Sequence, residues 1–260
     1  YSYDGHYFYT SYKNLVDDKK VNKNPYYNYY QYVPHRTTSY LNNVIYNTYV
    51  NDESALYNQA DVFFNIQAKY AINASMMYAL ALNESGLGLS QYALEYHNLF
   101  GHAAIDENPD NANQYKSIAD CVQQHAYNFL QQGYLNPEDS RYHGSWFGDK
   151  ASGINVNYAS DPYWGEKAAS FYYQLDEDGI DQKKNPIKTI QLSKDLKVYA
   201  PNKKDVLYTY KKGSIVSINI LKDEHRYYKI SSEAPVKDNH LNVNAKYKNS
   251  YAYIKKSDFK

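Results

Sequence analysis

A single carboxylate at the end of an apolar helical run is the residue best placed for acid–base chemistry. Leu80, Ala81 and Glu84 share one face of a predicted helix, so Glu84 is expected to face the apolar side. Gly86 and Gly88 predict that the helix ends just after it. Burial and the negative end of the helix dipole would both raise the pKa of Glu84, which suits a general acid near neutral pH. The alternative is a surface glutamate at a frayed helix end.

The composition excludes some functions and leaves others open. Lys plus Arg and Asp plus Glu each number 28 in 260 residues, so no basic excess points to nucleic acid, and we expect no nucleic-acid partner. The 34 tyrosines are unusual. A tyrosine has a flat apolar face and a polar tip, which suits stacking on sugar rings. General compositional bias explains most of them equally well, so only tyrosines inside motifs carry weight.

One cysteine and the absence of a long apolar run limit the further possibilities. Cys121 has no partner for an intramolecular disulfide, and its place on an apolar stripe predicts a buried thiol. No run approaches the roughly 20 apolar residues of a membrane span. Because the chain begins at Tyr1 and not at Met, we expect any export signal, membrane anchor or segment binding a membrane protein to lie upstream.

The sequence predicts a mainly helical α+β domain over residues 38–178, preceded by a Tyr-rich arm over 1–37 that packs on it. One short helix is expected in the arm near 11–18. The domain is expected to contain six helices, at Leu41–Val50, Ala60–Ala71, Ala74–Glu84, Ser90–Tyr96, Ser117–Gln132 and Pro162–Leu175.

The remaining segments are predicted to be extended. Residues 98–104 and 114–116 are expected to form a small β-hairpin around a polar turn. Residues 179–187 are charged and aperiodic, which is typical of a linker. Residues 188–260 are expected to form a small antiparallel barrel with strands at Ile190–Tyr199, Val206–Tyr210, Ser214–Leu221, Tyr227–Ile230 and Tyr251–Ile254.

Two motifs give the chain a resemblance to a known family. The segment Asn83–Gly101 begins Asn-Glu-Ser-Gly and ends Asn-Leu-Phe-Gly, and Asn157–Trp164 reads Asn-Tyr-Ala-Ser-Asp-Pro-Tyr-Trp. Both resemble elements of the bacterial endo-β-N-acetylglucosaminidases of glycoside hydrolase family 73. The resemblance implies a lysozyme-like fold over 38–178. It also implies hydrolysis of the β-1,4 bond between N-acetylglucosamine and N-acetylmuramic acid in peptidoglycan, outside the cytoplasmic membrane or in the cell wall, as in autolysins.

The resemblance assigns roles to particular residues. Glu84 matches the catalytic acid of the family, and Tyr158 matches a tyrosine important to activity. A phenol can stabilise developing charge in an oxocarbenium-like transition state without being the proton donor. Asn98, Phe100 and Gly101 match the motif that enters the cleft wall, and the resemblance implies that they contact substrate.

The second catalytic group stays open. Asp106 and Glu107, on the predicted hairpin turn, are the nearest candidates for a second carboxylate. A base that activates water would lie ~6.5–9.5 Å from the acid, whereas a nucleophile would lie ~5–5.5 Å away. The acetamido group of the substrate could also take this role, as in the substrate-assisted exceptions to the two-carboxylate scheme.

Other polar and aromatic residues are candidates for lining the cleft, for the core or for helix capping. His102 is a candidate for lining the cleft, and Trp146, between two glycines, is a candidate for stacking on a sugar. Trp164 lies on a helical stripe, which favours the core, and Asp161 before a proline is expected to cap that helix. The eight histidines lack metal-site spacing, so neither a metal nor an organic cofactor is expected.

The C-terminal strands resemble a bacterial SH3-like wall-binding module, which would bind wall peptide or dock on the catalytic domain. Two other functions compete with a glucosaminidase. One is a non-catalytic wall-binding or scaffold protein that keeps the same cleft. The other is a muramidase or lytic transglycosylase, whose folds share a helical catalytic glutamate.

Overall fold

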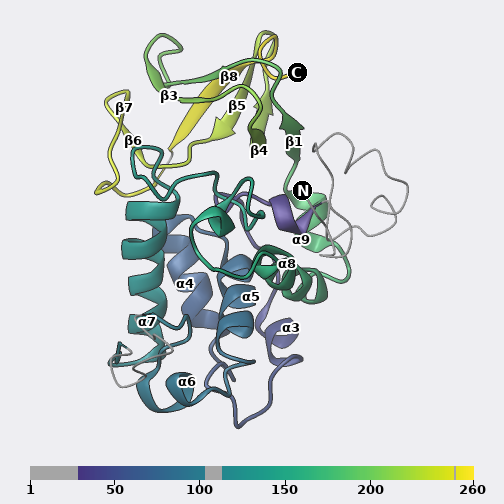
Figure 1. The fold of residues 1–260 in the computed structure, drawn as a ribbon, viewed down its shortest axis with the longest axis vertical. Helices are drawn as coiled ribbons and strands as arrows, with labels where there is room; N and C mark the ends of the chain where they lie inside the picture. Colours follow the sequence, from purple (N-terminus) through teal and green to yellow (C-terminus); the bar gives the residue numbers. More distant parts are fainter. Residues whose placement is uncertain (1–28, 103–112, 249) are drawn as a thin grey trace.

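The computed structural model describes residues 29–102, 113–248 and 250–260. These residues form a mainly helical part and a strand-rich part at one end of it, each with its own hydrophobic cluster (Figure 1). The first cluster draws on residues between Tyr30 and Leu175, and the second on residues between Leu192 and Phe259. The coarse prediction of helices followed by an antiparallel sheet is confirmed. Within the described residues, no helix has the length and apolar character needed to cross a membrane.

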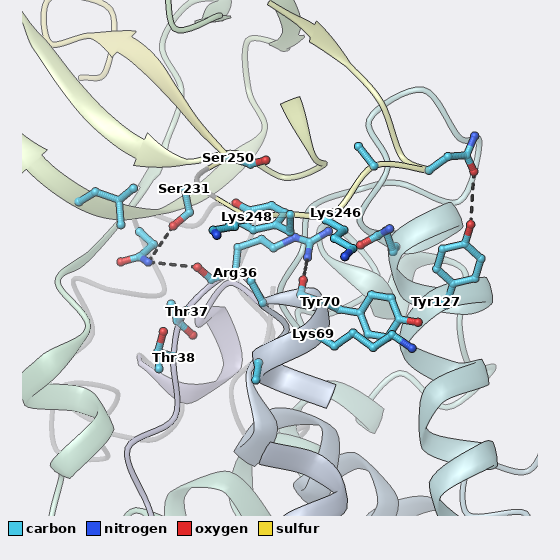
Figure 2. A pocket seen from close by; sticks show the side chains of 18 residues that line it. Arg36, Thr37, Thr38, Lys69, Tyr70, Tyr127, Ser231, Lys246, Lys248 and Ser250 are labelled. Atoms are coloured by element: carbon cyan, nitrogen blue, oxygen red, sulfur yellow. Dashed lines mark hydrogen bonds between the residues drawn. The ribbon is translucent and has the colours of Figure 1, made fainter. Parts of the chain in front are cut away.

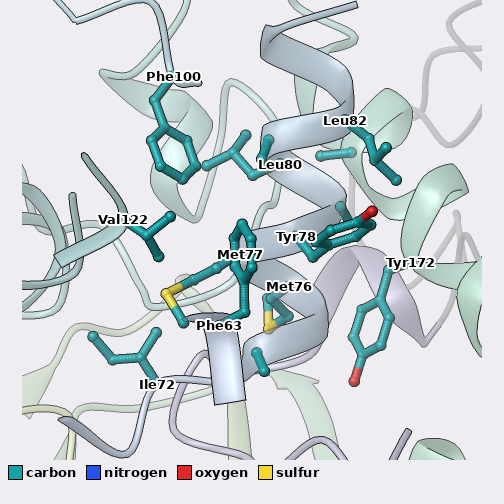
Figure 3. Packing of buried hydrophobic residues seen from close by; sticks show 14 of the residues in the cluster. Phe63, Ile72, Met76, Met77, Tyr78, Leu80, Leu82, Phe100, Val122 and Tyr172 are labelled. Atoms are coloured by element: carbon teal, nitrogen blue, oxygen red, sulfur yellow. The ribbon is translucent and has the colours of Figure 1, made fainter. Parts of the chain in front are cut away.

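Helix α5 (Ala74–Glu84) runs through the hydrophobic cluster of the helical part, as Figure 3 shows for Met77, Leu80 and Leu82. Asn73 caps it, because its side chain accepts a hydrogen bond from the Met76 backbone N–H at 3.0 Å. All residues from 74 to 82 are buried, so α5 is apolar on every side and must be enclosed by other elements. The enclosing helices include α4 (Ala60–Tyr70) and α8 (Trp164–Leu175), which lie on either side of it (Figure 1).

Three further predicted helices are found with shifted bounds, as α3 (Asn43–Asn47), as α6 (Gln91–Tyr96) and as α7 (Ile118–Gln124) followed by η4 (His125–Tyr134). The short helices η2 (Tyr30–Tyr32), η5 (Ile154–Val156) and α9 (Ile180–Lys184) were not predicted. The single helix predicted over 117–132 is in fact an α-helix that continues as the π-helix η4. A hydrophobic pattern does not distinguish these two windings over so short a span.

The interval 179–187, predicted as an aperiodic linker, contains α9 and the start of the first strand. Asp181 in α9 is buried and accepts hydrogen bonds from the Tyr40 backbone N–H at 2.6 Å and the Tyr172 hydroxyl at 2.9 Å. Burial raises its pKa to about 6. These long-range contacts, which no local pattern encodes, hold the interval against the helical part.

The C-terminal part contains a six-stranded antiparallel sheet with strand order β1-β4-β5-β8-β2-β3. The strands are β1 (Ile187–Gln191), β2 (Leu196–Tyr199), β3 (Val206–Tyr210), β4 (Ile215–Asp223), β5 (Tyr227–Ser231) and β8 (Tyr251–Lys255). The run predicted as one strand over 190–199 is divided between β1 and β2. The sheet is open, because β1 and β3 lie at opposite edges of it, so the closed barrel that we predicted is not found among the described residues. A second pair, β6 (Val236–Lys237) and β7 (His240–Leu241), was not predicted.

The predictions for the N-terminal arm and the small hairpin are only partly covered by the described residues. The helix expected near 11–18 lies outside them, as does the tip of the hairpin with Asp106 and Glu107. Residues 98–102 and 113–116 contain no strand, although the Tyr115 backbone N–H donates to the Tyr96 carbonyl at 2.9 Å. The last residues of the arm do pack on the domain, since buried Tyr30 donates a hydrogen bond to Asp176 at 2.7 Å.

The helical part and the sheet are joined by direct hydrogen bonds. The Gln131 side chain donates to the Val243 carbonyl at 2.6 Å, and the Asn219 side chain donates to the Arg36 carbonyl at 3.1 Å. The predicted division into arm, domain, linker and C-terminal domain stays a prediction, but these bonds show that its parts contact one another.

Candidate active site

Glu84 is the last residue of α5, and the chain turns away from the helix immediately after it. The Ser85 hydroxyl donates back to the Ala81 carbonyl at 2.5 Å, and the Gly88 backbone N–H donates to the Ser85 hydroxyl at 2.8 Å. Gly88 has φ of +78°, and a Cβ there would lie 2.3 Å from the Ser54 hydroxyl, so only glycine fits. The helix end that the glycines predicted is therefore confirmed, and it fixes the position of Glu84.

The Glu84 carboxyl is partly buried, and Trp164 is its partner from a distant part of the chain. The indole N–H of Trp164, at the start of α8, donates a short hydrogen bond to Glu84 Oε1. Burial raises the pKa of Glu84 above its ordinary value, and the hydrogen bonds from Trp164 and Asn83 partly oppose that rise. The nearby Asp161 carboxylate raises it further. A carboxyl group with a raised pKa can hold a proton and donate it at a pH where an exposed glutamate cannot.

The ring of Tyr158 packs on Trp164, the same residue whose indole N–H donates to Glu84. The Tyr158 ring centroid is 4.6 Å from that of Trp164 and 5.3 Å from that of Tyr134. Burial and the Glu84 carboxylate both raise the pKa of Tyr158 well above its ordinary value, so its hydroxyl stays protonated. Glu84 and Tyr158 thus both contact Trp164, and their catalytic roles stay predictions.

The loop between Tyr158 and α8 is shaped by Asp161. Its carboxylate accepts a hydrogen bond from the Tyr163 backbone N–H at 2.9 Å and pairs with Lys167 at 2.6 Å. These contacts lower the pKa of Asp161, although its partial burial acts in the opposite direction. The prediction that Asp161 caps this helix is wrong: α8 begins at Trp164, its N-cap residue is Tyr163, and no side chain caps it. Asp161 instead holds the turn that precedes the helix.

Asn98 and Gly101 form a tight turn after α6. The Asn98 amide donates to the His102 carbonyl at 2.9 Å and accepts from the His102 backbone N–H at 3.0 Å. Gly101 has φ of +63°, a left-handed conformation that favours glycine. Asn98 is buried and uses its amide within the protein, so it holds the turn and does not face a glycan.

Phe100 and His102 are buried in a stack of four rings beneath this turn. Phe100 stacks on His125 at 3.8 Å between centroids, and His102 stacks on Phe129 at 3.9 Å. His102 Nε2 lies 3.0 Å from His125 Nδ1, and burial lowers the pKa of His102 to about 4. Both rings face the interior (Figure 3 labels Phe100), so the expectation that they contact substrate is corrected to a supporting role.

Trp146 also differs from the expectation. It is 0% exposed, and its indole N–H donates to the Ser152 hydroxyl at 2.9 Å. The neighbouring glycines leave room for its ring, since a Cβ at Gly144 would lie 2.3 Å from it. Trp146 therefore presents no face on which a sugar could stack, because tight backbone packing encloses it.

The cysteine and the possible metal ligands form no second reactive site within the described residues. Cys121 is buried with its pKa raised to about 12, chiefly by burial, which agrees with the predicted structural thiol. Within residues 29–102, 113–248 and 250–260, no three histidine, cysteine or acidic side chains converge as metal ligands. Asp106 and Glu107 lie outside these ranges and stay predictions.

Residues 60–177 match the model of the family described as glucosaminidase, mannosyl-glycoprotein endo-beta-N-acetylglucosaminidase. This range contains Glu84, Trp164 and Tyr158. Residues 60–177 are a glucosaminidase-family domain. The family that the two sequence motifs indicated is therefore confirmed for this part of the chain.

Curated relatives support the same assignment of the glucosaminidase domain. Two proteins of Streptococcus pneumoniae, from serotype 4 strain TIGR4 and from strain R6, are provisionally named endo-beta-N-acetylglucosaminidase. Each is 35% identical over 126 residues, which are 48% of this chain and 18% and 17% of the respective relatives. This chain thus corresponds to less than a fifth of each relative's length.

Solved structures similar to this chain include autolysins. A catalytic mutant of S. aureus autolysin E in complex with the disaccharide NAG-NAM has a TM-score of 0.47 and 20% identity, covering 57% of this chain and 72% of that one. A major bifunctional autolysin has a TM-score of 0.45 and 24% identity, covering 63% of this chain and 74% of that one.

Trp164 of the glucosaminidase domain contacts Glu84, which was not predicted from the sequence. Its helical spacing predicted a core residue, and at 3% exposure it is one. Its indole N–H nevertheless donates a hydrogen bond to the Glu84 carboxyl group. The sequence offered one indication of this contact, since Trp164 ends the motif Asn157–Trp164 that also contains Tyr158.

We expect Trp164→Phe to change the pH dependence of the glucosaminidase domain. The indole N–H stabilises the ionised form of Glu84, so its removal raises the pKa of Glu84 further. Activity that needs protonated Glu84 is lost as pH rises through that pKa, so the alkaline limb of the kcat profile should move to higher pH. Trp146→Phe is the matched control, because it removes a buried indole donor that bonds Ser152. An alkaline limb that does not move in Trp164→Phe would contradict this role.

Proposed function

We propose that this chain is a peptidoglycan hydrolase that cleaves the β-1,4 bond between N-acetylglucosamine and N-acetylmuramic acid, with Glu84 as general acid. One observation carries the proposal. Within the glucosaminidase-family domain, Trp164 contacts both a partly buried glutamate of raised pKa and a tyrosine that stays protonated. A paired proton donor and neutral hydrogen-bond donor suit a reaction in which a glycosidic oxygen is protonated while positive charge develops on the sugar.

In the proposed mechanism, Glu84 transfers its proton to the glycosidic oxygen as the bond from that oxygen to the anomeric carbon breaks. The leaving sugar departs with a new hydroxyl group. The Tyr158 hydroxyl positions the substrate's acetamido group or stabilises charge in the oxocarbenium-like transition state. Water then adds to the anomeric carbon, assisted by the acetamido group or by Asp106 or Glu107, and Glu84 regains its proton.

We further propose that the chain acts at the cell wall, outside the cytoplasmic membrane, and that its C-terminal part is related to SH3-like wall-binding modules. The provisional glucosaminidase names of the pneumococcal relatives support the first proposal. The antiparallel pairing of the C-terminal sheet supports the second, although the sheet is open. A membrane anchor or membrane-protein partner encoded upstream stays a prediction from the sequence.

A digest of purified peptidoglycan followed by mass spectrometry of the products tests the proposed activity. We expect fragments with N-acetylglucosamine at the new reducing end. Fragments with reducing muramic acid would instead identify a muramidase, and anhydro-muramic acid a lytic transglycosylase. Glycan binding without any product would identify a non-catalytic wall-binding protein. Each of these three results would overturn the proposal.

A further inference from the structure

A pocket of about 700 Å³ lies between the helical part and the C-terminal sheet (Figure 2). Its walls come from the end of α4, from η4, from β4 and β5, and from the segment after β7. It does not include Glu84, Trp164 or Tyr158, so it is separate from the candidate active site.

The charge of the pocket differs from that of the whole chain. Arg36, Lys69, Lys246 and Lys248 line it, and no acidic residue is among its described lining residues. The chain as a whole has equal numbers of basic and acidic residues. Lys246 and Lys248 are exposed, and neither forms an ion pair within the described part of the chain. A concave surface with charge of one sign concentrates ligands of the opposite sign.

Arg36 is a buried cation at the wall of this pocket, and the buried Glu233 carboxylate, which does not line the pocket, lies close enough to offset part of its charge. Arg36 is 4% exposed, and it donates from Nε to the Glu233 carbonyl at 2.7 Å and from Nη1 to the Tyr70 carbonyl at 2.6 Å. Its guanidinium carbon lies 4.1 Å from the centre of the Tyr247 ring. Among the described residues, Nη2 has no hydrogen-bond partner. A buried donor without a partner is costly, so the group favours an acceptor supplied by a ligand.

A second lining residue, Gln131, has an acceptor that is unpaired within the described part of the chain and so needs a hydrogen-bond donor. Gln131 is 1% exposed and donates from Nε2 to the Val243 carbonyl, but its Oε1 has no partner in the described residues. A ligand that satisfies both groups must present an anionic acceptor to Arg36 and an N–H or O–H donor to Gln131. A peptide with an acidic side chain offers a carboxylate and backbone N–H groups together. Hydrogen phosphate, the form present near neutral pH, also carries both acceptors and an O–H donor, so the aromatic lining decides between the two ligands.

The aromatic lining fits a peptide as well. Tyr70 and Tyr127 lie with ring centroids 5.9 Å apart on the wall near Lys69 (Figure 2). Their faces can cover an apolar side chain or the peptide plane. We propose that this pocket binds a short acidic peptide, with the peptide carboxylate toward Arg36, Lys246 and Lys248 and a backbone N–H toward Gln131.

Fluorescence anisotropy with a labelled Ala-Glu-Ala peptide that carries a free C-terminal carboxylate tests the proposal. Because Arg36 also joins the two parts of the chain, the test variant replaces the exposed lysines, as Lys246→Met with Lys248→Met. We expect the Kd to weaken about tenfold, since each exposed charge contributes modestly. The matched control, Lys212→Met with Lys237→Met, replaces exposed lysines that do not line the pocket and should bind as the unaltered chain does.

Two further probes identify the chemistry of the ligand. An Ala-Gln-Ala peptide with an amidated C-terminus should bind at least about tenfold more weakly, because it lacks both carboxylates. Equal binding of this neutral peptide, or an unchanged Kd in the Lys246 and Lys248 variant, would overturn the proposal. If inorganic phosphate at equal concentration displaces the acidic peptide, the pocket is a phosphate site and the peptide proposal is overturned. The assay needs no turnover, so its outcome is independent of the proposed hydrolase activity.

Discussion

Replacing Glu84 with glutamine should lower the release of reducing ends from purified peptidoglycan by about 1,000-fold, because general acid catalysis typically contributes 10²–10⁴-fold. Glutamine keeps the shape of the side chain and an oxygen that can accept the Trp164 indole hydrogen bond. It cannot donate the proton that the departing sugar needs. The chemical step should therefore fail while the surrounding structure is retained.

The stability of the Glu84→Gln variant separates catalysis from folding. The raised pKa of Glu84 means that the folded state favours its protonated form, so stability is lost as pH rises and the carboxyl ionises. A neutral amide avoids that loss, and Tm at pH 7 should equal or exceed that of the unaltered chain. Glu95→Gln, on the exposed side of α6, is the control and should keep full activity. Turnover retained by Glu84→Gln would end its assignment as the acid.

Tyr158→Phe should lower kcat by about 100-fold with little change in KM, since loss of one preorganised hydrogen-bond donor typically costs 10²–10³-fold. The phenylalanine ring can keep the packing against Trp164 and Tyr134, so only the hydroxyl is lost. That hydroxyl is protonated at every working pH, because the pKa of Tyr158 is raised well above its ordinary value. Its contribution should therefore be nearly independent of pH.

The neighbouring phenol provides the control for this prediction. Tyr134→Phe removes a hydroxyl from the ring that packs on Tyr158 and should leave kcat almost unchanged. The Tm of both variants should stay close to that of the unaltered chain. A Tyr158→Phe variant with normal kcat would assign Tyr158 a structural role in the loop before α8.

Local sequence patterns predicted the helical elements well where both the apolar spacing and the ends were marked. Helix α5 has the predicted bounds, because Asn73 caps its start and the glycine-containing turn stops it after Glu84. The same signals predicted that Glu84 is the acid to consider. Where the capping and spacing signals were weaker, the observed helix bounds differ from the predicted ones. The helix predicted over 117–132, for example, changes from α-helix to π-helix at His125.

The roles of several aromatic residues could not be read from spacing. A helical or loop pattern predicts burial, but burial alone does not tell whether a buried indole bonds a carboxyl group or a serine. Trp164 and Trp146 are both buried donors, and only the fold places the first against Glu84. Phe100 and His102 followed a recognisable motif, yet the ring stack with His125 and Phe129 turned them inward.

The sequence by itself determined the catalytic candidate, the family to which its motifs pointed and the order of helices before strands, because short-range spacing and capping control these features. Only the tertiary structure decided that the sheet is open, that Trp164 joins Glu84 to Tyr158, and that Arg36 and Gln131 line one pocket. These features depend on contacts between distant parts of the chain, such as Trp164 with Glu84, 80 positions apart, and Gln131 with Val243, 112 positions apart. Packing of the whole chain fixes such contacts, and no local pattern records them.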